Sequence, residues 1–357
     1  MKIAIIVHNL TGGGAERVAA MWATGFAARG HDVVVITHDA KDRPITYQLS
    51  EDVRLKNITT HCSNRLLRIL QRTMMLRSLL KGEKPNVVID VIPDYWKAIA
   101  MIGLPCRKIS TEHSSFERPE KAKVPFNRYK KIYLNRLYDH VTVLTQADKA
   151  VIGSQLKHVS VMPNPLAFPP ATIIPRKEKV VLATGRLDSW HYKGFDILIK
   201  AWANIADKVV GWKLQIAGGG NGKGLDYLQK LCKDYEISDS VNFVGFQSNI
   251  LPYYQAASIF VLSSRYEGFG LVLIEAMSQG CACIACDYKG RQKEVIASEE
   301  QGLLCEPENI QQLSQSMLSL IQDENRRKDM RAHAIARASD FHIDRIMDKW
   351  EKLLNGE

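Results

Sequence analysis

Two glutamates, Glu267 and Glu275, are separated by seven residues where an apolar strand is predicted to turn over glycines into a helix. The predicted strand is 258–263, and the glycines of the turn are Gly268 and Gly270. A helix that begins after such a turn offers backbone N–H groups and the positive end of its dipole to an anion. Carboxylates accept hydrogen bonds from hydroxyls. The combination suits a ligand with phosphate in its middle and polyols at both ends, such as a nucleotide sugar.

The elements that must position these glutamates alternate along the whole chain of 357 residues, with apolar strand-like runs separated by amphipathic helical stretches. A chain of this length is longer than a single compact hydrophobic core usually accommodates, so we expect two domains. Runs of Val and Ile without alternation indicate strands buried on both faces of a parallel sheet. The expected strands are 3–7, 33–37, 87–92, 108–112, 141–144 and 159–162 in the first half, and 180–183, 214–217, 241–244, 259–262, 281–285 and 302–304 in the second.

A segment rich in proline, from Met162 to Pro175, separates the two series and is the best candidate linker. We therefore predict an α/β fold of two doubly wound, Rossmann-like domains that face a central cleft, with boundaries at 1–165 and 166–340. Residues 341–357 have helical spacing and are expected to pack back on the first domain. Ligands of such sheets bind outside the carboxyl ends of the strands, where the motifs described here fall.

Composition narrows the class of protein. No apolar stretch approaches the roughly 20 residues that span a bilayer, and the first residues turn polar too early for a signal peptide. Three of the seven cysteines crowd together at Cys281, Cys283 and Cys286. A metal site is one interpretation, but a buried strand explains the run better, because free Cys packs as a small apolar residue. Reduced thiols and no export signal predict the cytoplasm.

Glycine turns follow several of the predicted strands. After the first strand, Gly12, Gly13 and Gly14 permit close backbone approach to a ligand. A dinucleotide fingerprint would need a sixth-position glycine where Arg17 stands, which disfavours a hydride-transfer cofactor. In the second half, the turn that begins at Gly218 and the glycine Gly245 leave similar room, the latter for a flat base.

Two cations follow the first strand of the second half. Arg186 lies beside Gly185 in the turn, and Lys193 comes at the start of the next helical stretch. A guanidinium fork and a compact ammonium both suit phosphate. Solvated loop cations are the alternative, but their position at strand ends, with the glutamate segment, favours a binding role.

Three segments together resemble a known family: Gly12 to Glu16, Gly185 to Leu187 with Lys193 and Gly194, and Glu267 with Glu275. They are similar to the retaining nucleotide-sugar glycosyltransferases of family four, which have the two-domain GT-B architecture. The resemblance covers nearly the whole chain, and the spaced glutamate pair is its specific part. It implies that residues 1–165 bind an acceptor and residues 166–340 bind a nucleotide sugar.

The resemblance also implies roles for the matched positions. Glu267 contacts hydroxyls of the donor sugar, Glu275 holds the ribose, Arg186 and Lys193 clamp the diphosphate, and His113 lies beside the donor sugar. Of these, His113, Arg186, Lys193 and Glu267 form the expected catalytic set. The other expected donor-binding residues are Gly13, Gly14, Gly185, Gly218, Phe243, Gly245, Phe269, Gly270 and Leu271.

The expected chemistry is transfer of a hexose or N-acetylhexosamine. Breaking a sugar–diphosphate bond places negative charge on the leaving phosphate, which Arg186, Lys193 and the helix N-terminus stabilise. The chain has no Asp-x-Asp sequence, so we expect no metal and no other cofactor. Retaining glycosidases use a carboxylate nucleophile, whereas the family mechanism implied here is front-face attack by the acceptor, with α-linkage retained.

A basic patch carries nearly the whole net charge of +10. Residues 61–140 hold sixteen basic and seven acidic side chains, which implies an anionic partner. The stretches 65–77 and 121–136 interleave cations with apolar and aromatic residues, as membrane-surface helices do. We expect Arg68, Arg72, Lys130 and Lys131 to contact a lipid-linked saccharide acceptor or an anionic membrane. A solvated helix face and nucleic acid are the other interpretations, and the last is disfavoured.

The residues leave several alternatives open. A nucleotide-sugar epimerase of the same fold would need no acceptor, and a non-catalytic nucleotide-sugar-binding protein would need no turnover. A uridine diphosphate sugar is the expected donor, with guanosine diphosphate mannose second. The leading hypothesis places the enzyme on the inner face of the cell membrane, in surface polysaccharide, lipopolysaccharide or glycolipid synthesis.

Overall fold

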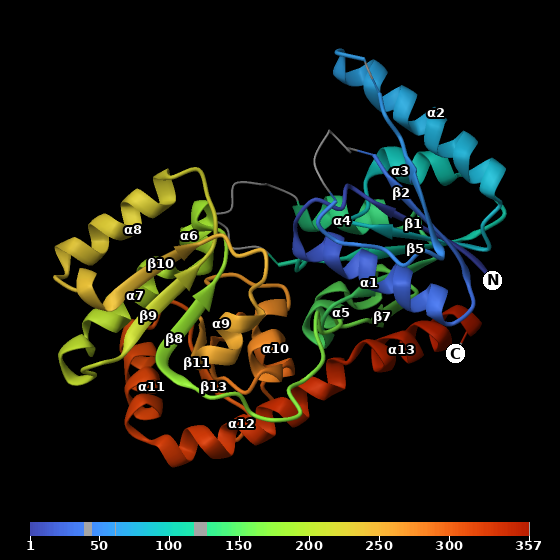
Figure 1. Cartoon of the computed structure of the whole chain (residues 1–357). Helices are drawn as coiled ribbons and strands as arrows, with labels where there is room; N and C mark the ends of the chain where they lie inside the picture. Colours follow the sequence, from blue (N-terminus) through green and yellow to red (C-terminus); the bar gives the residue numbers. More distant parts are fainter. Residues whose placement is uncertain (39–44, 61, 118–126, 357) are drawn as a thin grey trace. The chain divides into compact units, whose positions relative to one another are not determined.

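The chain divides into two compact units, Met1–Ala167 with Ile343–Glu357 (unit 1) and Phe168–His342 (unit 2). The computed structural model describes residues 1–38, 45–60, 62–117 and 127–356. The division after Ala167 lies two residues beyond the boundary expected from the sequence. Each unit is a twisted parallel sheet with helices on both faces (Figure 1), so the predicted Rossmann-like α/β architecture is confirmed.

Unit 1 is built on a seven-stranded parallel sheet of order β3-β2-β1-β4-β5-β6-β7. Its strands are β1 (Lys2–Val7), β2 (Asp32–Thr37), β3 (Val53–Asn57), β4 (Val87–Val91), β5 (Arg107–Glu112), β6 (His140–Val143) and β7 (Val159–Val161). Its helices are α1 (Gly14–Ala28), α2 (Arg65–Glu83), α3 (Tyr95–Met101), α4 (Asn127–Asn135), α5 (Gln146–Ile152) and α13 (Ile343–Asn355). From β1 the strand order runs one way through β2 and β3 and the other way from β4 to β7. The carboxyl ends of β1 and β4 therefore lie at a topological switch point.

The edge strand β3 is absent from the predicted set. Only Val53 of its five residues is buried, so the segment has no apolar run to indicate a strand. It forms because its backbone pairs with β2, from Val33 opposite Val53 to Thr37 opposite Asn57. An edge strand can be polar because one of its sides and much of its faces meet water.

The terminal helix α13 packs within unit 1, beside α1 (Figure 1). Trp350 is fully buried, and its ring meets Trp22 at 4.9 Å and Phe26 at 5.8 Å between centroids. Gly25 makes room for Met347, whose Cγ and Sδ would lie 2.9 Å from a Cβ at that position. The last helix therefore completes the core beneath α1.

Unit 2 has a six-stranded parallel sheet of order β10-β9-β8-β11-β12-β13. Its strands are β8 (Glu178–Thr184), β9 (Lys213–Ala217), β10 (Val241–Gly245), β11 (Ala257–Leu262), β12 (Ala282–Cys286) and β13 (Leu303–Cys305). Its helices are α6 (Trp190–Lys193), α7 (Phe195–Ala203), α8 (Lys223–Asp234), α9 (Leu251–Ala256), α10 (Leu271–Ser278), α11 (Ile310–Gln322) and α12 (Glu324–Ala338). The switch point of this sheet lies between β8 and β11, and the glutamate segment follows β11.

The cysteine run forms strand β12 from Ala282 onward, as the apolar interpretation predicts. Cys281, Cys283 and Cys286 are buried and free. Burial raises the pKa of each thiol, that of Cys286 to about 12. Within the described residues, no three His, Cys, Asp or Glu side chains group so as to hold a metal ion. The three thiols are packing groups of the sheet.

Candidate functional site

The glycine turns of unit 2 bring three strand ends into direct backbone contact. Gly185 N–H donates to Ala217 O, and Gly218 N–H donates to Gly245 O, both at 2.9 Å. A Cβ on Gly218 would lie 1.7 Å from the carbonyl oxygen of Gly185. Only glycine fits there, so the ends of β8, β9 and β10 form a bare backbone surface at the carboxyl edge of the sheet.

Lys193 and Glu267 meet at this edge. Lys193 ends α6, Glu267 lies in the turn after β11, and their Nζ and Oε2 atoms are 2.8 Å apart. The Lys193 stem lies over Gly185, because a Cβ on that glycine would be 3.2 Å from its Cγ and Cδ. Ser264 Oγ donates to the same Glu267 oxygen at 3.3 Å. The side chains of Lys193 and Glu267 are 26% and 19% exposed, so this ion pair is accessible to a ligand.

The helix α10 begins beside this pair. Gly270 caps it in the left-handed region, with φ of 89°, which favours glycine. Phe269 is buried, and its ring packs on Phe341 at 5.5 Å between centroids. This packing fixes the turn, so that the N–H groups of Leu271 and Val272 come at the carboxyl end of β11, while Leu273 N–H donates to Gly270 O at 2.8 Å. The local geometry is that of an anion site at a helix N-terminus.

The second glutamate is enclosed. Glu275 is only 1% exposed, and Tyr254 Oη donates to its Oε2 at 3.0 Å. Thr184, at the end of β8, lies 3.4 Å from the same Tyr254 hydroxyl. Tyr254 was not among the sequence-predicted residues, because a tyrosine on the short helix α9 carries no signal of its contact with α10.

The remaining residues of unit 2 that the sequence predicts to bind the donor differ in exposure. Arg186 is exposed, and its guanidinium has no hydrogen-bond or ionic partner among the residues that the structure describes. Phe243 is half-buried and packs against the core. Gly245 has φ of 71°, and the next residue, Phe246, is 72% exposed. This end of the site therefore offers a cation and an aromatic face.

His113 lies in unit 1 at the end of β5. Burial lowers the pKa of His113 to about 4, so the imidazole is neutral at pH 7. Its Nε2 is 3.1 Å from Thr111 Oγ1, and its ring centroid is 5.5 Å from that of Trp22. The Asn164 amide lies beside the ring and partly offsets the lowering. A neutral imidazole of fixed orientation has one nitrogen that donates and one that accepts a hydrogen bond, so it can bind hydroxyls.

The glycine loop of unit 1 is covered by the side chain of Glu16. Gly13 caps α1 with φ of 124°, and its N–H donates to Tyr47 Oη at 3.3 Å. The Glu16 carboxylate folds back over the loop, where a Cβ on Gly13 would lie 2.2 Å from Glu16 Oε2. Burial raises the pKa of Glu16. A carboxylate at this helix end faces the positive end of the α1 dipole, and the donor-binding role of Gly13 and Gly14 stays a prediction.

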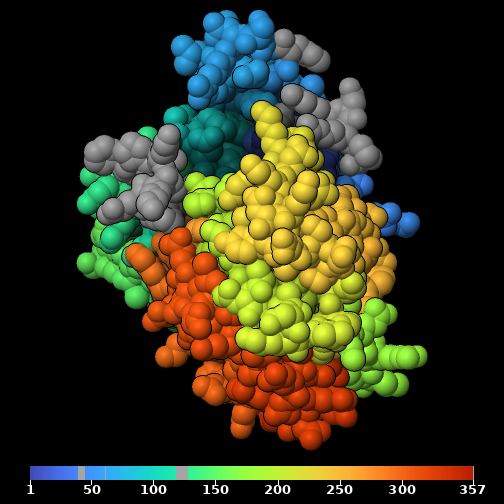
Figure 2. Space-filling view, turned by 90° about the vertical axis from the view of Figure 1, so that its left-hand side faces the viewer, coloured from blue at the N-terminus to red at the C-terminus, as the bar shows by residue number. Residues whose placement is uncertain are grey.

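The basic helix α2 projects from unit 1 (Figures 1 and 2). Only Leu76 and Leu80 of its nineteen residues are buried, while Leu66 and Met74 are 77% and 62% exposed. A hollow of about 540 Å³ is lined by parts of α2 and α3. Its basic lining residues are Arg65, Arg68 and Arg72.

Lys131 corrects one sequence prediction. Its Nζ bonds Glu112 Oε2 at 2.7 Å, Ser114 O at 2.9 Å and Ser114 Oγ at 2.8 Å, and it lies 5.0 Å from the Phe116 ring centroid. All its donors are used in the interior, so Lys131 is a structural cation and not a membrane contact. Lys130, its neighbour, is exposed. Residues 118–126, which include Lys121 and Lys123 of the predicted basic stretch, lie outside the described residues.

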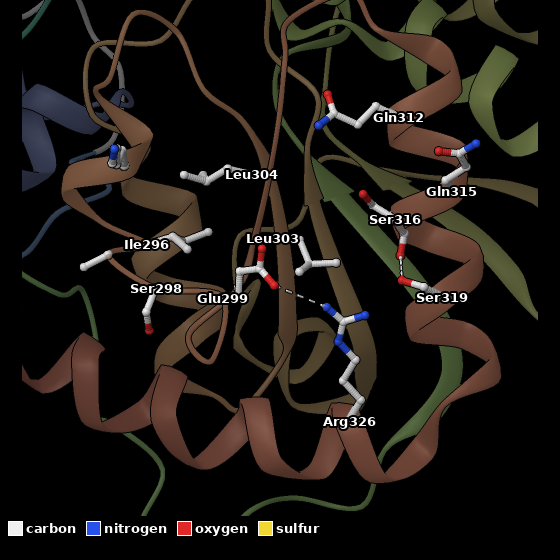
Figure 3. A pocket seen from close by; sticks show the side chains of 13 residues that line it. Ile296, Ser298, Glu299, Leu303, Leu304, Gln312, Gln315, Ser316, Ser319 and Arg326 are labelled. Atoms are coloured by element: carbon white, nitrogen blue, oxygen red, sulfur yellow. Dashed lines mark hydrogen bonds and ion pairs between the residues drawn. The ribbon is translucent and has the colours of Figure 1, made fainter.

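A further hollow of unit 2, of about 500 Å³, is not the candidate site (Figure 3). It lies between α11 and the segment around Ile296, and none of the predicted donor-binding residues lines it. Its polar groups bond one another: Ser319 Oγ donates to Ser316 O at 3.0 Å, and Arg326 pairs with Glu299 at 4.0 Å.

Comparison with known proteins identifies the family. Residues 12–166 match the model of Glycosyltransferase Family 4, and residues 167–337 match that of Glycosyl transferases group 1. A glycosyltransferase of Haemophilus influenzae, described as uncharacterized, is 30% identical over 99% of both chains. A Campylobacter jejuni protein named as an α-1,4-N-acetyl-D-galactosaminyltransferase acting on a diphospho-undecaprenol-linked saccharide is 29% identical, over 99% of this chain and 98% of its own.

Solved structures share the fold. TarM of S. aureus, solved with UDP, superposes with a TM-score of 0.84 at 16% identity, over 99% of both chains. HepE of Anabaena, solved with UDP and glucose, has the same TM-score at 19% identity over the full length of both chains. No helix in the described ranges is long and apolar enough to cross a membrane. The chain belongs to family four of the glycosyltransferases, of GT-B fold and group 1, and it is a hexosyltransferase.

Proposed function

We propose that this enzyme moves a hexose or N-acetylhexosamine from a nucleotide diphosphate sugar, first of all a UDP-sugar, to a lipid-linked saccharide. The observation that carries the proposal is the Lys193–Glu267 pair at 2.8 Å, at the N-terminal end of α10. A cation suits the diphosphate and a carboxylate suits the sugar hydroxyls. The names of two Campylobacter relatives, each acting on a diphospho-undecaprenol saccharide, support the acceptor class.

In the proposed reaction, the main role of unit 2 is to stabilise the negative charge that develops on the leaving diphosphate. Arg186, Lys193 and the first N–H groups of α10 stabilise the leaving diphosphate. Glu267 orients the sugar hydroxyls, and Glu275 holds the ribose. The acceptor hydroxyl attacks the face that the diphosphate leaves, and a phosphate oxygen takes its proton, so the anomeric configuration is retained. No step requires a metal ion.

Turnover with defined substrates tests this proposal. The purified enzyme is assayed with UDP-sugars and GDP-mannose, with and without a short-chain polyprenyl diphosphate saccharide. We expect α-linked product by NMR, equal rates with EDTA, and little free sugar without acceptor. Release of free sugar or an epimer at full rate without acceptor would favour the epimerase. Donor binding with no turnover on any lipid saccharide would favour a binding protein.

We also propose that the enzyme works at the inner face of the cell membrane, in the synthesis of a surface polysaccharide, lipopolysaccharide or glycolipid. Exposed leucines and methionines beside the cations of α2 support this, because apolar insertion adds to attraction by anionic lipid. Vesicles of phosphatidylglycerol and phosphatidylcholine test it by co-sedimentation at low salt. Reversing Arg68, Arg72 and Lys130 to Glu should release the enzyme, whereas the same reversal of the exposed Lys56, Lys149 and Lys157 should not. Equal binding by both variants would contradict the proposal.

A further inference from the structure

Arg265 joins the two segments of unit 2 that carry Lys193 and Glu267. Its Nη1 and Nη2 donate to the two carboxylate oxygens of Asp196 at 2.7 and 2.8 Å, a bidentate pair. The same Nη1 donates to His191 O at 2.6 Å, and Arg265 N–H donates to Tyr192 O at 2.9 Å. Arg265 comes two residues before Glu267, and Asp196 comes three residues after Lys193.

The two backbones are in close contact beneath this ion pair. Ser263 Oγ donates to Lys193 O at 2.8 Å. A Cβ on Gly194 would lie 1.9 Å from Ser263 O, and Gly194 has φ of 65°. The glycine therefore lets the strand end at Ser263 touch the end of α6. Any loosening of Arg265 would change the offset between these segments, and with it the position of Lys193 against Glu267.

Burial distinguishes this pair from an ordinary surface ion pair. The side chains of Arg265 and Asp196 are 15% and 8% exposed, whereas Glu308, which accepts from Arg265 Nε at 2.7 Å, is 65% exposed. Burial lowers the pKa of Arg265, but the bonds to Asp196 and Glu308 outweigh it and raise the pKa overall. A planar fork held by a buried carboxylate fixes direction as well as distance.

We infer that Arg265 and Asp196 are positioning residues for donor binding, acting through Lys193 and Glu267. This inference rests on the proposed function, because it assumes that Lys193 holds the diphosphate. Neither residue needs to touch the donor: the guanidinium is engaged by Asp196, Glu308 and His191 O. Their effect on binding must therefore disappear when the group they position is removed.

A double-mutant cycle on nucleotide binding tests this dependence. The probe is UDP, or GDP if UDP does not bind, measured by isothermal titration calorimetry on the full chain. Arg265→Gln should weaken binding about tenfold, because a small misplacement of a binding group is enough for such a loss. Lys193→Ala should weaken it at least as much, and the double variant should bind no worse than Lys193→Ala alone. Arg265→Lys should lose most of the affinity, and Glu308→Gln should lose less than twofold.

The outcomes distinguish failure of the proposed donor site from failure of the positioning role of Arg265. If Lys193→Ala binds nucleotide normally, or if neither nucleotide binds the wild-type protein, the proposed donor site fails and the inference fails with it. If Lys193→Ala is impaired but Arg265→Gln costs the same factor in both backgrounds, Arg265 affects binding independently of Lys193 and the inference alone is overturned. Melting temperatures are recorded for each variant. Should Arg265→Gln not fold, Asp196→Asn and Arg265→Lys carry the same cycle.

Discussion

Replacing Lys193 by Met removes one charge from the proposed donor site and keeps the apolar stem that lies over Gly185. The lost bond joins charged groups, and such bonds contribute about 1.5–3 kcal/mol. With about 1.4 kcal/mol for each tenfold change, kcat/KM for the donor should fall roughly 10- to 150-fold. The free energy of unfolding should fall by about 1–2 kcal/mol, because a pair whose side chains are 26% and 19% exposed lies between a surface ion pair and a buried one.

The assay is steady-state transfer at varied donor concentration, with urea unfolding of the same preparation. Lys230→Met is the matched control, because Lys230 is an exposed lysine of α8 in the same unit. If Lys193→Met and Lys230→Met have the same kcat/KM within twofold, Lys193 does not hold the leaving group. If kcat/KM falls only in proportion to the folded fraction, the side chain supports the turn and not the chemistry.

Three further predictions concern single positions. Glu275→Ala should weaken donor binding at least tenfold by calorimetry, because it removes a buried carboxylate, whereas Tyr254→Phe keeps that carboxylate and should cost less; equal losses would contradict this order. Gly218→Ala should destabilise unit 2 by about 1–3 kcal/mol, because its Cβ meets Gly185 O, while Gly82→Ala, with open space in α2, should stabilise by about 0.5–1 kcal/mol; both are read from urea midpoints. His113, with its pKa lowered to about 4, contributes stability that is complete above the unfolded value near 6.5 and is lost as pH falls from 6.5 to about 4. His113→Gln should therefore flatten this part of the stability–pH curve by up to about 3 kcal/mol, and an unchanged slope would show that His113 titrates normally in the folded state.

The sequence was sufficient for the central strands, such as β1, β2, β4 and β11, because they are buried on both faces and read as apolar runs rich in Val and Ile. It was insufficient for β3, whose residues after Val53 are exposed and polar and whose strand character comes from pairing with β2. The helix α2 extends to Glu83, beyond the expected stretch, since helix ends depend on capping more than on periodicity.

The sequence names the residues of the proposed site but not the contacts among them. Lys131 has the same charge as Lys130 and stands beside it, yet one is bonded to Glu112 in the interior and the other faces water. Nothing local to the chain separates them, because Glu112 lies nineteen positions away. Tyr254 escaped prediction for the same reason, since its partner Glu275 is twenty-one positions distant.

The contact between Lys193 and Glu267 has a consequence for the energetics of donor binding. The two groups stand 74 positions apart in the chain and neutralise each other in the folded unit. A donor that takes the ammonium for its diphosphate and the carboxylate for its hydroxyls must first separate them, so part of its binding energy replaces an existing ion pair. Free UDP offers a diphosphate but lacks the transferred sugar, and its binding would leave Glu267 with Ser264 as the bonded partner that the structure shows. The complete nucleotide sugar gives a partner to both Lys193 and Glu267 after they separate.

The Glu267→Gln variant should therefore bind the complete donor more weakly than wild type does. It should bind free UDP at least as tightly as wild type, because no carboxylate then competes for Lys193. Weaker binding of UDP by Glu267→Gln would show that the carboxylate positions the lysine and does not compete with the ligand.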